Sequence, residues 1–227
     1  MSVWLFTGCT APETESTKTT VAPVAVTLPG SECLMSKRCR QAVLTHKELV
    51  ALDLSNADLT LASMRGSDLS KSNLSGAKMS SADLYEATLE YADLTQANLK
   101  FAKMTGARAS QANFHLADLS SAELGDSDFR GADFSRANLS RAGFAHSDLS
   151  VAQFVAANLS YADFYATNLT RADFSGANLL GANFEKANLT RANFSGATNV
   201  DFSGTYLQNT TMPDGRICSG SPFELKC

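Results

Sequence analysis

The residues of this chain that could carry chemistry are its histidines, its cysteines and an Asp or Asn that recurs along most of its length. The three histidines, His46, His115 and His146, are far apart in the sequence, and no nucleophile, base and orienting group stand at a catalytic spacing. The Asp or Asn recurs in nearly every short polar stretch, which favours a turn-forming role over acid–base or metal chemistry. We therefore expect no enzyme, no cofactor and no metal site.

Four cysteines form two local pairs. Cys33 and Cys39 stand close together, as do Cys218 and Cys227 near the other end of the chain. This arrangement favours two disulfides in an oxidising compartment, with free thiols as the alternative. A zinc site is disfavoured because the spacing is not C-x-x-C and His46 has no histidine partner nearby.

The fifth cysteine, Cys9, ends an apolar stretch that is followed by a Thr- and Pro-rich tether. Residues 5–9, LFTGC, resemble a bacterial lipobox, which makes Cys9 a candidate for lipidation and membrane anchoring. Against this, no Lys or Arg precedes Cys9, and Phe6 is an unusual lipobox residue. Another form of export and an unstructured cytoplasmic tail are the alternatives. We predict an extracytoplasmic protein, in the periplasm or anchored to a membrane as a lipoprotein.

Between Leu54 and Phe194 the sequence has a period of five residues. A large apolar residue (Leu, Phe or Met) holds every fifth position, with one exception at Ala109 among 29 positions. Ala stands two residues earlier in 23 of 28 units, and Asp or Asn stands between them in 21 of 29. A step of five rotates by about 140° round an α-helix and changes face in a β-strand, so neither element makes one core from it. The chain must turn once per unit, which predicts a solenoid of stacked repeats.

Phenylalanine indicates the number of sides in each coil. From Phe134 to Phe194, Phe and Leu alternate at the large positions, so Phe recurs every ten residues. With four five-residue sides, residues 20 apart stack, and Phe falls into two pure columns on opposite sides. Their rings would stack at the spacing of neighbouring strands, about 4.8 Å. The columns are Phe134, Phe154, Phe174 and Phe194, and Phe144, Phe164 and Phe184.

These units resemble the tandem A(D/N)LXX repeats of the pentapeptide-repeat family, from near Leu52 to Met212. The resemblance implies an all-β fold, a right-handed quadrilateral parallel β-helix of about eight coils. It also implies an alternative function, because some members imitate DNA and bind DNA gyrase in the cytoplasm, giving quinolone resistance or toxin immunity. That role needs a strongly acidic rod, whereas residues 54–212 contain 16 Asp and Glu against 12 Lys and Arg.

We predict four segments. They are a signal or lipobox remnant with a flexible tether at 1–30, an N-terminal cap at 31–51, the repeat β-helix at 52–212 and a C-terminal cap or tail at 213–227.

Both caps have distinct patterns. The mixed apolar and charged residues of 34–51 predict one or two short helical turns over the first coil. At the other end Asn199 falls where a core residue is due, and the period resumes three residues late at Phe202, which predicts a bulge near 198–200. The turn residues at 213–215 predict a terminal hairpin or loop.

A few outward residues depart from the repeat. We interpret one group either as solvated charges or as a basic recognition patch, made of Lys71, Lys78, Lys100, Lys103 and Arg108. Arg171 and Arg191, 20 residues apart, are predicted to stack on one face, either solvated or binding an anion.

Composition limits the remaining functions. The net charge is −4 without a large basic stripe, so nucleic-acid binding is not expected, and no apolar run reaches the 18 residues of a membrane span. We predict a non-enzymatic structural or binding scaffold that uses its faces to contact an unidentified protein, with self-association left open.

Overall fold

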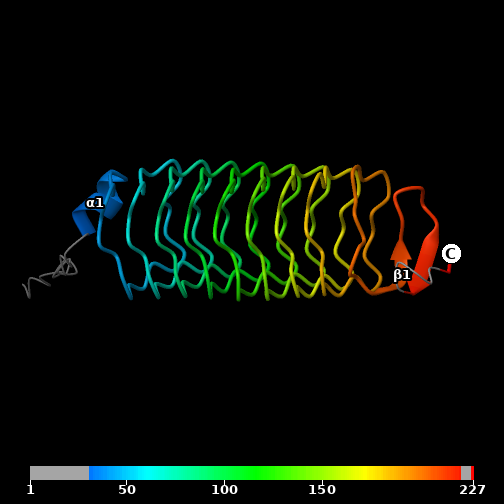
Figure 1. Cartoon of the computed structure of the whole chain (residues 1–227). Helices are drawn as coiled ribbons and strands as arrows, with labels where there is room; N and C mark the ends of the chain where they lie inside the picture. The colour runs from blue at the N-terminus through cyan, green and yellow to red at the C-terminus, as the bar shows by residue number, and fades with distance from the viewer. Residues whose placement is uncertain (1–30, 221–225) are drawn as a thin grey trace, which may run out of the picture.

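The computed structural model describes residues 31–220 and 226–227, so the predictions for 1–30, including lipidation of Cys9, lie outside the described residues. The chain forms a rod of stacked coils with a short helix at one end and a small hairpin at the other (Figure 1). Helix α1 spans Ser31–Ser36, and strands β1 and β2 span Leu207–Thr211 and Ile217–Gly220. Between them, each short side of the rod is joined to the next coil by one parallel bridge.

Four series of bridges define four sides. Each bridge in the regular part joins residues 20 apart, and eight such steps separate Arg38 from Thr198. This is the four-unit coil predicted from the phenylalanine pattern, whereas its right-handed sense stays a prediction. The first, second, third and fourth sides are the series that start at Arg38, Val43, Glu48 and Asp53. Residues between sides form edges: the first edge lies between the first and second sides, and the third between the third and fourth.

The two inward positions of each unit fill the interior. The large residues from Leu54 to Phe194 are at most 1% exposed, and the small residues between them are also buried. In the two predicted phenylalanine columns, successive ring centroids lie 4.8–5.2 Å apart with nearly parallel planes. The two columns are therefore confirmed, and each buried ring contributes about 1.5–3 kcal/mol of transfer free energy.

Ala109, the exception in the period, stands next to an unusually large neighbour. It lies between Leu89 and Phe129 in the column of the third side. The Phe129 ring contacts Phe134 of its own coil at 5.6 Å and Phe114 of the preceding coil at 6.0 Å, both edge-to-face. One small and one large side chain thus share the room that two leucines take elsewhere in the column.

The recurring Asp or Asn completes the hydrogen bonding of each unit. In one unit, the N–H groups of Gly131 and Phe134 donate to the following coil, and that of Asp133 donates to the preceding coil. The N–H of Ala132 donates to the carbonyl three residues earlier. The fifth N–H, from Ser135, donates to the Asp133 carboxylate at 2.8 Å. The acidic or amide residue is therefore a turn residue, as predicted.

The same side chains also form ladders between coils. On the first side, Asn138 Nδ2 donates to Asp118 Oδ1 at 3.1 Å, and Asn158 donates to Asn138 at 3.2 Å. The ladder continues through Asn178 to Asn199. A carboxylate only accepts, so it begins a ladder, whereas an amide accepts and donates and can continue it.

The β-helix begins earlier than predicted. Helix α1 ends at Ser36, and Arg38 already bridges the next coil. The predicted boundary at residue 52 is therefore wrong, and the helical part of the predicted cap over 31–51 is confined to α1.

The first coil was hidden in the sequence by its small inward positions. Cys39, Leu44 and Leu49 continue the five-residue spacing and are at most 3% exposed. However, Lys47 and Leu52 stand where later units have Ala, and both are half-buried. Because no preceding coil packs against them, larger side chains fit at this end of the rod.

The last coil is two residues shorter than the others. Its bridges, Asn188–Tyr206 and Asn193–Thr211, join residues 18 apart instead of 20. The predicted bulge at 198–200 is wrong, because the first of these residues still makes the regular bridge. A slip three residues late and one two residues early leave the same register in a period of five, so the sequence could not distinguish them.

The predicted terminal hairpin is present, although it starts before residue 213. Strands β1 and β2 pair antiparallel. The hairpin also closes the rod, because its carbonyls accept N–H groups of the preceding coil at 2.8–2.9 Å. The donor–acceptor pairs are Arg191–Gln208, Phe194–Thr211 and Gly196–Pro213.

Candidate interaction surfaces

The structure separates the residues of the predicted basic patch. Lys78, Lys100 and Lys103 lie on the first side, the first edge and the second side. Arg108 lies on the third side, and Lys71 lies on the third edge. The five residues occupy neighbouring coils, as predicted, but they do not form one patch.

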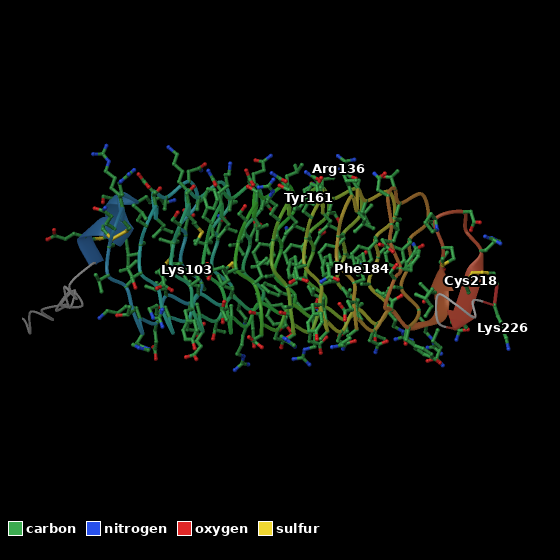
Figure 2. The ribbon with its side chains drawn as sticks, in the orientation of Figure 1. Lys103, Arg136, Tyr161, Phe184, Cys218 and Lys226 are labelled. Carbon is green, nitrogen blue, oxygen red and sulfur yellow. A yellow bond between two sulfur atoms is a disulfide. The ribbon has the colours of Figure 1, made fainter. Side chains whose placement is uncertain are left out.

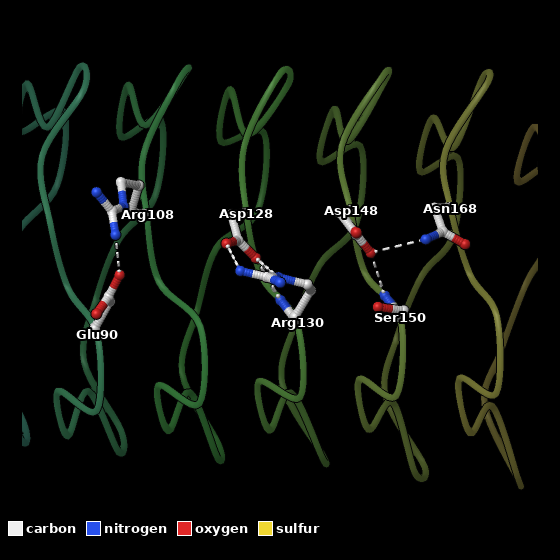
Figure 3. Close-up of polar contacts among 7 residues, drawn as sticks. All are labelled: Glu90, Arg108, Asp128, Arg130, Asp148, Ser150 and Asn168. Atoms are coloured by element: carbon white, nitrogen blue, oxygen red, sulfur yellow. Dashed lines mark hydrogen bonds and ion pairs between the residues drawn. The ribbon is translucent and has the colours of Figure 1, made fainter.

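The charges of the third side pair with one another (Figure 3). Arg108 forms an ion pair with Glu90 at 2.6 Å. Arg130 forms a bidentate pair with Asp128, with N–O distances of 2.8 and 2.7 Å. The hydrogen bond from Arg130 holds the pKa of the Asp128 carboxyl below its usual range. These arginines are therefore not free to bind an external anion.

Beyond Asp148 the third side has amides in place of carboxylates. Asn168 Nδ2 donates to Asp148 Oδ1 at 3.0 Å, and the Thr170 hydroxyl donates to Asn168 Oδ1 at 2.8 Å. Asn188 Nδ2 donates to the Thr170 hydroxyl at 3.1 Å, and the Thr190 hydroxyl donates to Asn188 at 2.7 Å. The result is a neutral chain of hydrogen bonds along the C-terminal part of this side.

A groove of about 440 Å³ lies beside this chain, on the third edge. It is lined by four successive residue pairs at 150–151, 170–171, 190–191 and 208–209. Its charged residues are Arg171 and Arg191, which lie on adjacent coils as predicted. Within the described part of the chain, neither guanidinium is within 4.0 Å of a carboxylate oxygen. We call this hollow the arginine groove.

The first edge is apolar and basic. Its exposed apolar residues are 46–57% accessible, and they are Leu61, Phe101, Tyr161 and Leu180. Its charged residues are Arg40, Lys100 and Arg141, and no Asp or Glu occurs at its positions from 40–41 to 180–181. On a chain with a net charge of −4, this edge has the opposite sign.

Contacts along the edge hold its aromatic rings. Tyr161 lies over Gly181 of the next coil, where an added Cβ would be 2.7 Å from the ring. The Arg141 guanidinium lies 5.9 Å from the Tyr161 ring centroid, and the Lys100 ammonium lies 5.9 Å from that of Phe101. Figure 2 shows Tyr161 at the surface of the rod. The sequence showed these residues singly, but it did not indicate that they share one edge.

Both predicted disulfides are present, one at each end (Figure 2). Cys33–Cys39 joins α1 to the first coil, and Cys218–Cys227 joins β2 to the last residue of the chain. Each closes a short loop over an end of the rod.

The histidines lie apart from one another on the edges. His46 and His146 are on the second edge, several coils apart, and His115 is on the fourth. Over 31–220 and 226–227, no three His, Cys, Asp or Glu side chains form a group that could hold a metal. In the same part of the chain, no helix is both long and apolar enough to cross a membrane.

Sequence comparison identifies the class of protein that this geometry represents. Matches to "Pentapeptide repeats (8 copies)" extend over residues 38–76, 48–84, 77–115 and 97–136. A match to "Pentapeptide repeat region" covers 117–194. The chain therefore belongs to the pentapeptide-repeat family, as the sequence predicted. No curated protein matches the chain.

Solved structures of the same class resemble the chain. HetL from the cyanobacterium Nostoc sp. strain PCC 7120, involved in heterocyst differentiation regulation, is 32% identical over 82% of this chain and 96% of its own, with a TM-score of 0.30. A pentapeptide repeat protein from the thylakoid lumen of Arabidopsis thaliana is 35% identical over 49% of this chain and 67% of its own, with a TM-score of 0.20. A trypsin-treated form of QnrB1, a plasmid-mediated fluoroquinolone resistance protein, is 20% identical over 76% and 90%, with a TM-score of 0.49.

Proposed function

We propose that this protein is a non-enzymatic scaffold whose first edge contacts a partner protein. The observation that carries the proposal is the row of exposed apolar residues on this edge. The coil does not require them, because Ser81, Ser121 and Gly181 hold the same edge position as Phe101 and Tyr161 in other coils. Exposed aromatic side chains in one region are typical of protein contacts.

The charge of the edge limits the chemistry of the partner. Three cations accompany the apolar residues, and no carboxylate of the edge offsets them. A partner surface with apolar pockets bordered by acidic groups would complement this edge.

We further propose that the protein is exported, with Cys9 as its lipid anchor. The disulfides Cys33–Cys39 and Cys218–Cys227 support export, because disulfides persist in oxidising compartments. A scaffold tethered through a Thr- and Pro-rich segment could place its rod away from the membrane surface.

Gyrase binding by imitation of DNA is the alternative function. It requires a strong, continuous negative surface, but on the third side Glu90 and Asp128 are paired with arginines. We therefore favour the scaffold. Inhibition or protection of gyrase by micromolar purified protein in a supercoiling assay would restore the alternative.

Site-specific photo-crosslinking in the native host tests the first edge. A benzoylphenylalanine placed at Phe101 or Tyr161 should give one discrete adduct of higher mass. The matched control is Gln111 on the third edge, which has a similar positive φ of 59°. Equal adducts from Gln111, or none from either first-edge position, would contradict the proposed contact.

Fractionation tests export separately. We expect alkylation of the four paired cysteines only after reduction, in a membrane or periplasmic fraction, and a diacylglycerol-modified Cys9 by mass spectrometry. A soluble cytoplasmic chain with four free thiols would refute export and leave the photo-crosslinking result to stand alone.

A further inference from the structure

The arginine groove differs from the other places where arginines occur in the rod. Arg65, Arg108 and Arg130 each lie within 4.0 Å of a carboxylate oxygen. Arg171 and Arg191 do not, within the described part of the chain, although both are exposed and lie on adjacent coils. Two like charges at this separation repel each other, which an anion between them would relieve.

The neighbouring carboxylates are engaged by neutral donors. Asp173, two residues after Arg171, accepts the Ser175 N–H at 2.8 Å and Asn193 Nδ2 at 3.1 Å, both at Oδ1. Asp148 likewise accepts from its own turn and from the next coil at Oδ1. The amides that replace carboxylates at 168 and 188 are used in the neutral chain beside the groove. The protein thus provides two guanidinium groups without providing their counterions.

The backbone fixes the spacing of the two arginines. The Arg171 N–H donates to the Thr190 carbonyl at 2.9 Å, and the Arg191 N–H donates to the Gln208 carbonyl at 2.8 Å. Both residues have a positive φ, of 61° and 58°, so both side chains leave the edge in the same sense. Their Cα atoms are therefore about 5 Å apart, which is the spacing of adjacent strands. An anion with two charged ends can reach both forks at this spacing.

We propose that the arginine groove is a binding site for a small ligand that carries two anionic groups, phosphate or carboxylate, bridged by Arg171 and Arg191. Each guanidinium provides two parallel N–H donors to one group, which a lysine could not do. The site lies on the edge opposite the proposed partner contact and does not depend on that contact.

Titration of the purified full chain tests the proposal, with pyrophosphate as the phosphate probe and succinate as the carboxylate probe. At low salt we expect saturable chemical-shift changes at residues 170–171 and 190–191, with a Kd of about 1 mM or tighter. Arg171→Gln and Arg191→Gln should each weaken binding about 10-fold, and Arg171→Lys should recover only part of the loss. The control is Arg136→Gln, because Arg136 has the same backbone conformation, with a φ of 58°, but no arginine on either adjacent coil.

The probes also distinguish the source of the anion. Binding of pyrophosphate alone indicates a phosphate-bearing ligand, and binding of succinate alone indicates a dicarboxylate; either result supports the site. Absence of saturable binding with both probes, or equal weakening by Arg136→Gln, would overturn it. The spectra of each variant show whether it is folded, so a loss of binding is not confused with unfolding.

Discussion

The pairing of Ala109 with Phe129 predicts strong energetic coupling between these two core positions. Leu has three more side-chain carbons than Ala and three fewer than Phe, so an Ala–Phe pair and a Leu–Leu pair fill the column with the same number of carbons. Ala109→Leu alone adds a side chain to a filled interior and should cost about 1–3 kcal/mol. Phe129→Leu alone removes three carbons, at about 0.8 kcal/mol each, and its edge-to-face contacts with Phe114, Phe134 and Phe144.

The double variant should be far more stable than the sum of the single variants predicts. It removes both the overpacking and the void, and what remains is the lost aromatic contact of Phe129, about 1 kcal/mol. We therefore expect a coupling free energy of about 2–3 kcal/mol from urea denaturation followed by circular dichroism, with an unchanged m-value. Single-variant effects that add to within about 0.5 kcal/mol would refute the idea that the two residues share one space.

Three further predictions concern the ladders, the charges and the ends. Asn158→Asp keeps both acceptor roles but loses the bond donated to Asn138, so it should cost about 1 kcal/mol, against about 2–3 kcal/mol for Asn158→Ala, by urea denaturation. Equal costs would argue against a ladder. The Asp53 carboxyl, bonded by Ser55 and Lys37, should titrate by NMR with a pKa of about 2. Because this pKa is lowered, its contribution to stability is complete above the unfolded value of about 3.9 and is lost as the pH falls through about 2. A midpoint near 3.9 in the folded protein would contradict the bonding. Reduction of both disulfides should destabilise each end by at most about 2–3 kcal/mol, seen as faster hydrogen exchange in 37–56 and 207–220 with no change in 134–154. Uniformly faster exchange would instead indicate that the rod unfolds as one unit.

The core of the rod could be predicted because its determinants repeat locally. Each large residue faces inward for the same reason as the one before it, so the period and the phenylalanine alternation were sufficient to predict four sides and two ring columns. The start of the rod could not be predicted in this way. There Lys47 and Leu52 occupy positions that only neighbours on both sides would restrict to small residues.

The surface was harder to predict because recognition depends on which residues share an edge. Once the coil length is 20 residues, Leu61, Phe101 and Tyr161 fall on one edge, and this signal is available in the sequence. The basic patch was instead drawn from nearness along the chain, which scatters residues over different sides. Ion pairing is a further limit, because the bond between Arg108 and Glu90 depends on side-chain conformations that the repeat does not specify.

The hydrogen bonds between coils give the rod a direction. In a regular side, two N–H groups point toward the following coil for each one that points back, so the two ends have different chemistry: one lacks donors, and the other has an excess of them. Uncapped coils of this kind would join head to tail and grow into a fibre. Pro213 stops this growth at one end, because its carbonyl accepts the Gly196 N–H while its own nitrogen has no hydrogen to offer. The disulfide-closed hairpin thus makes a finite molecule of a structure that could otherwise extend without limit.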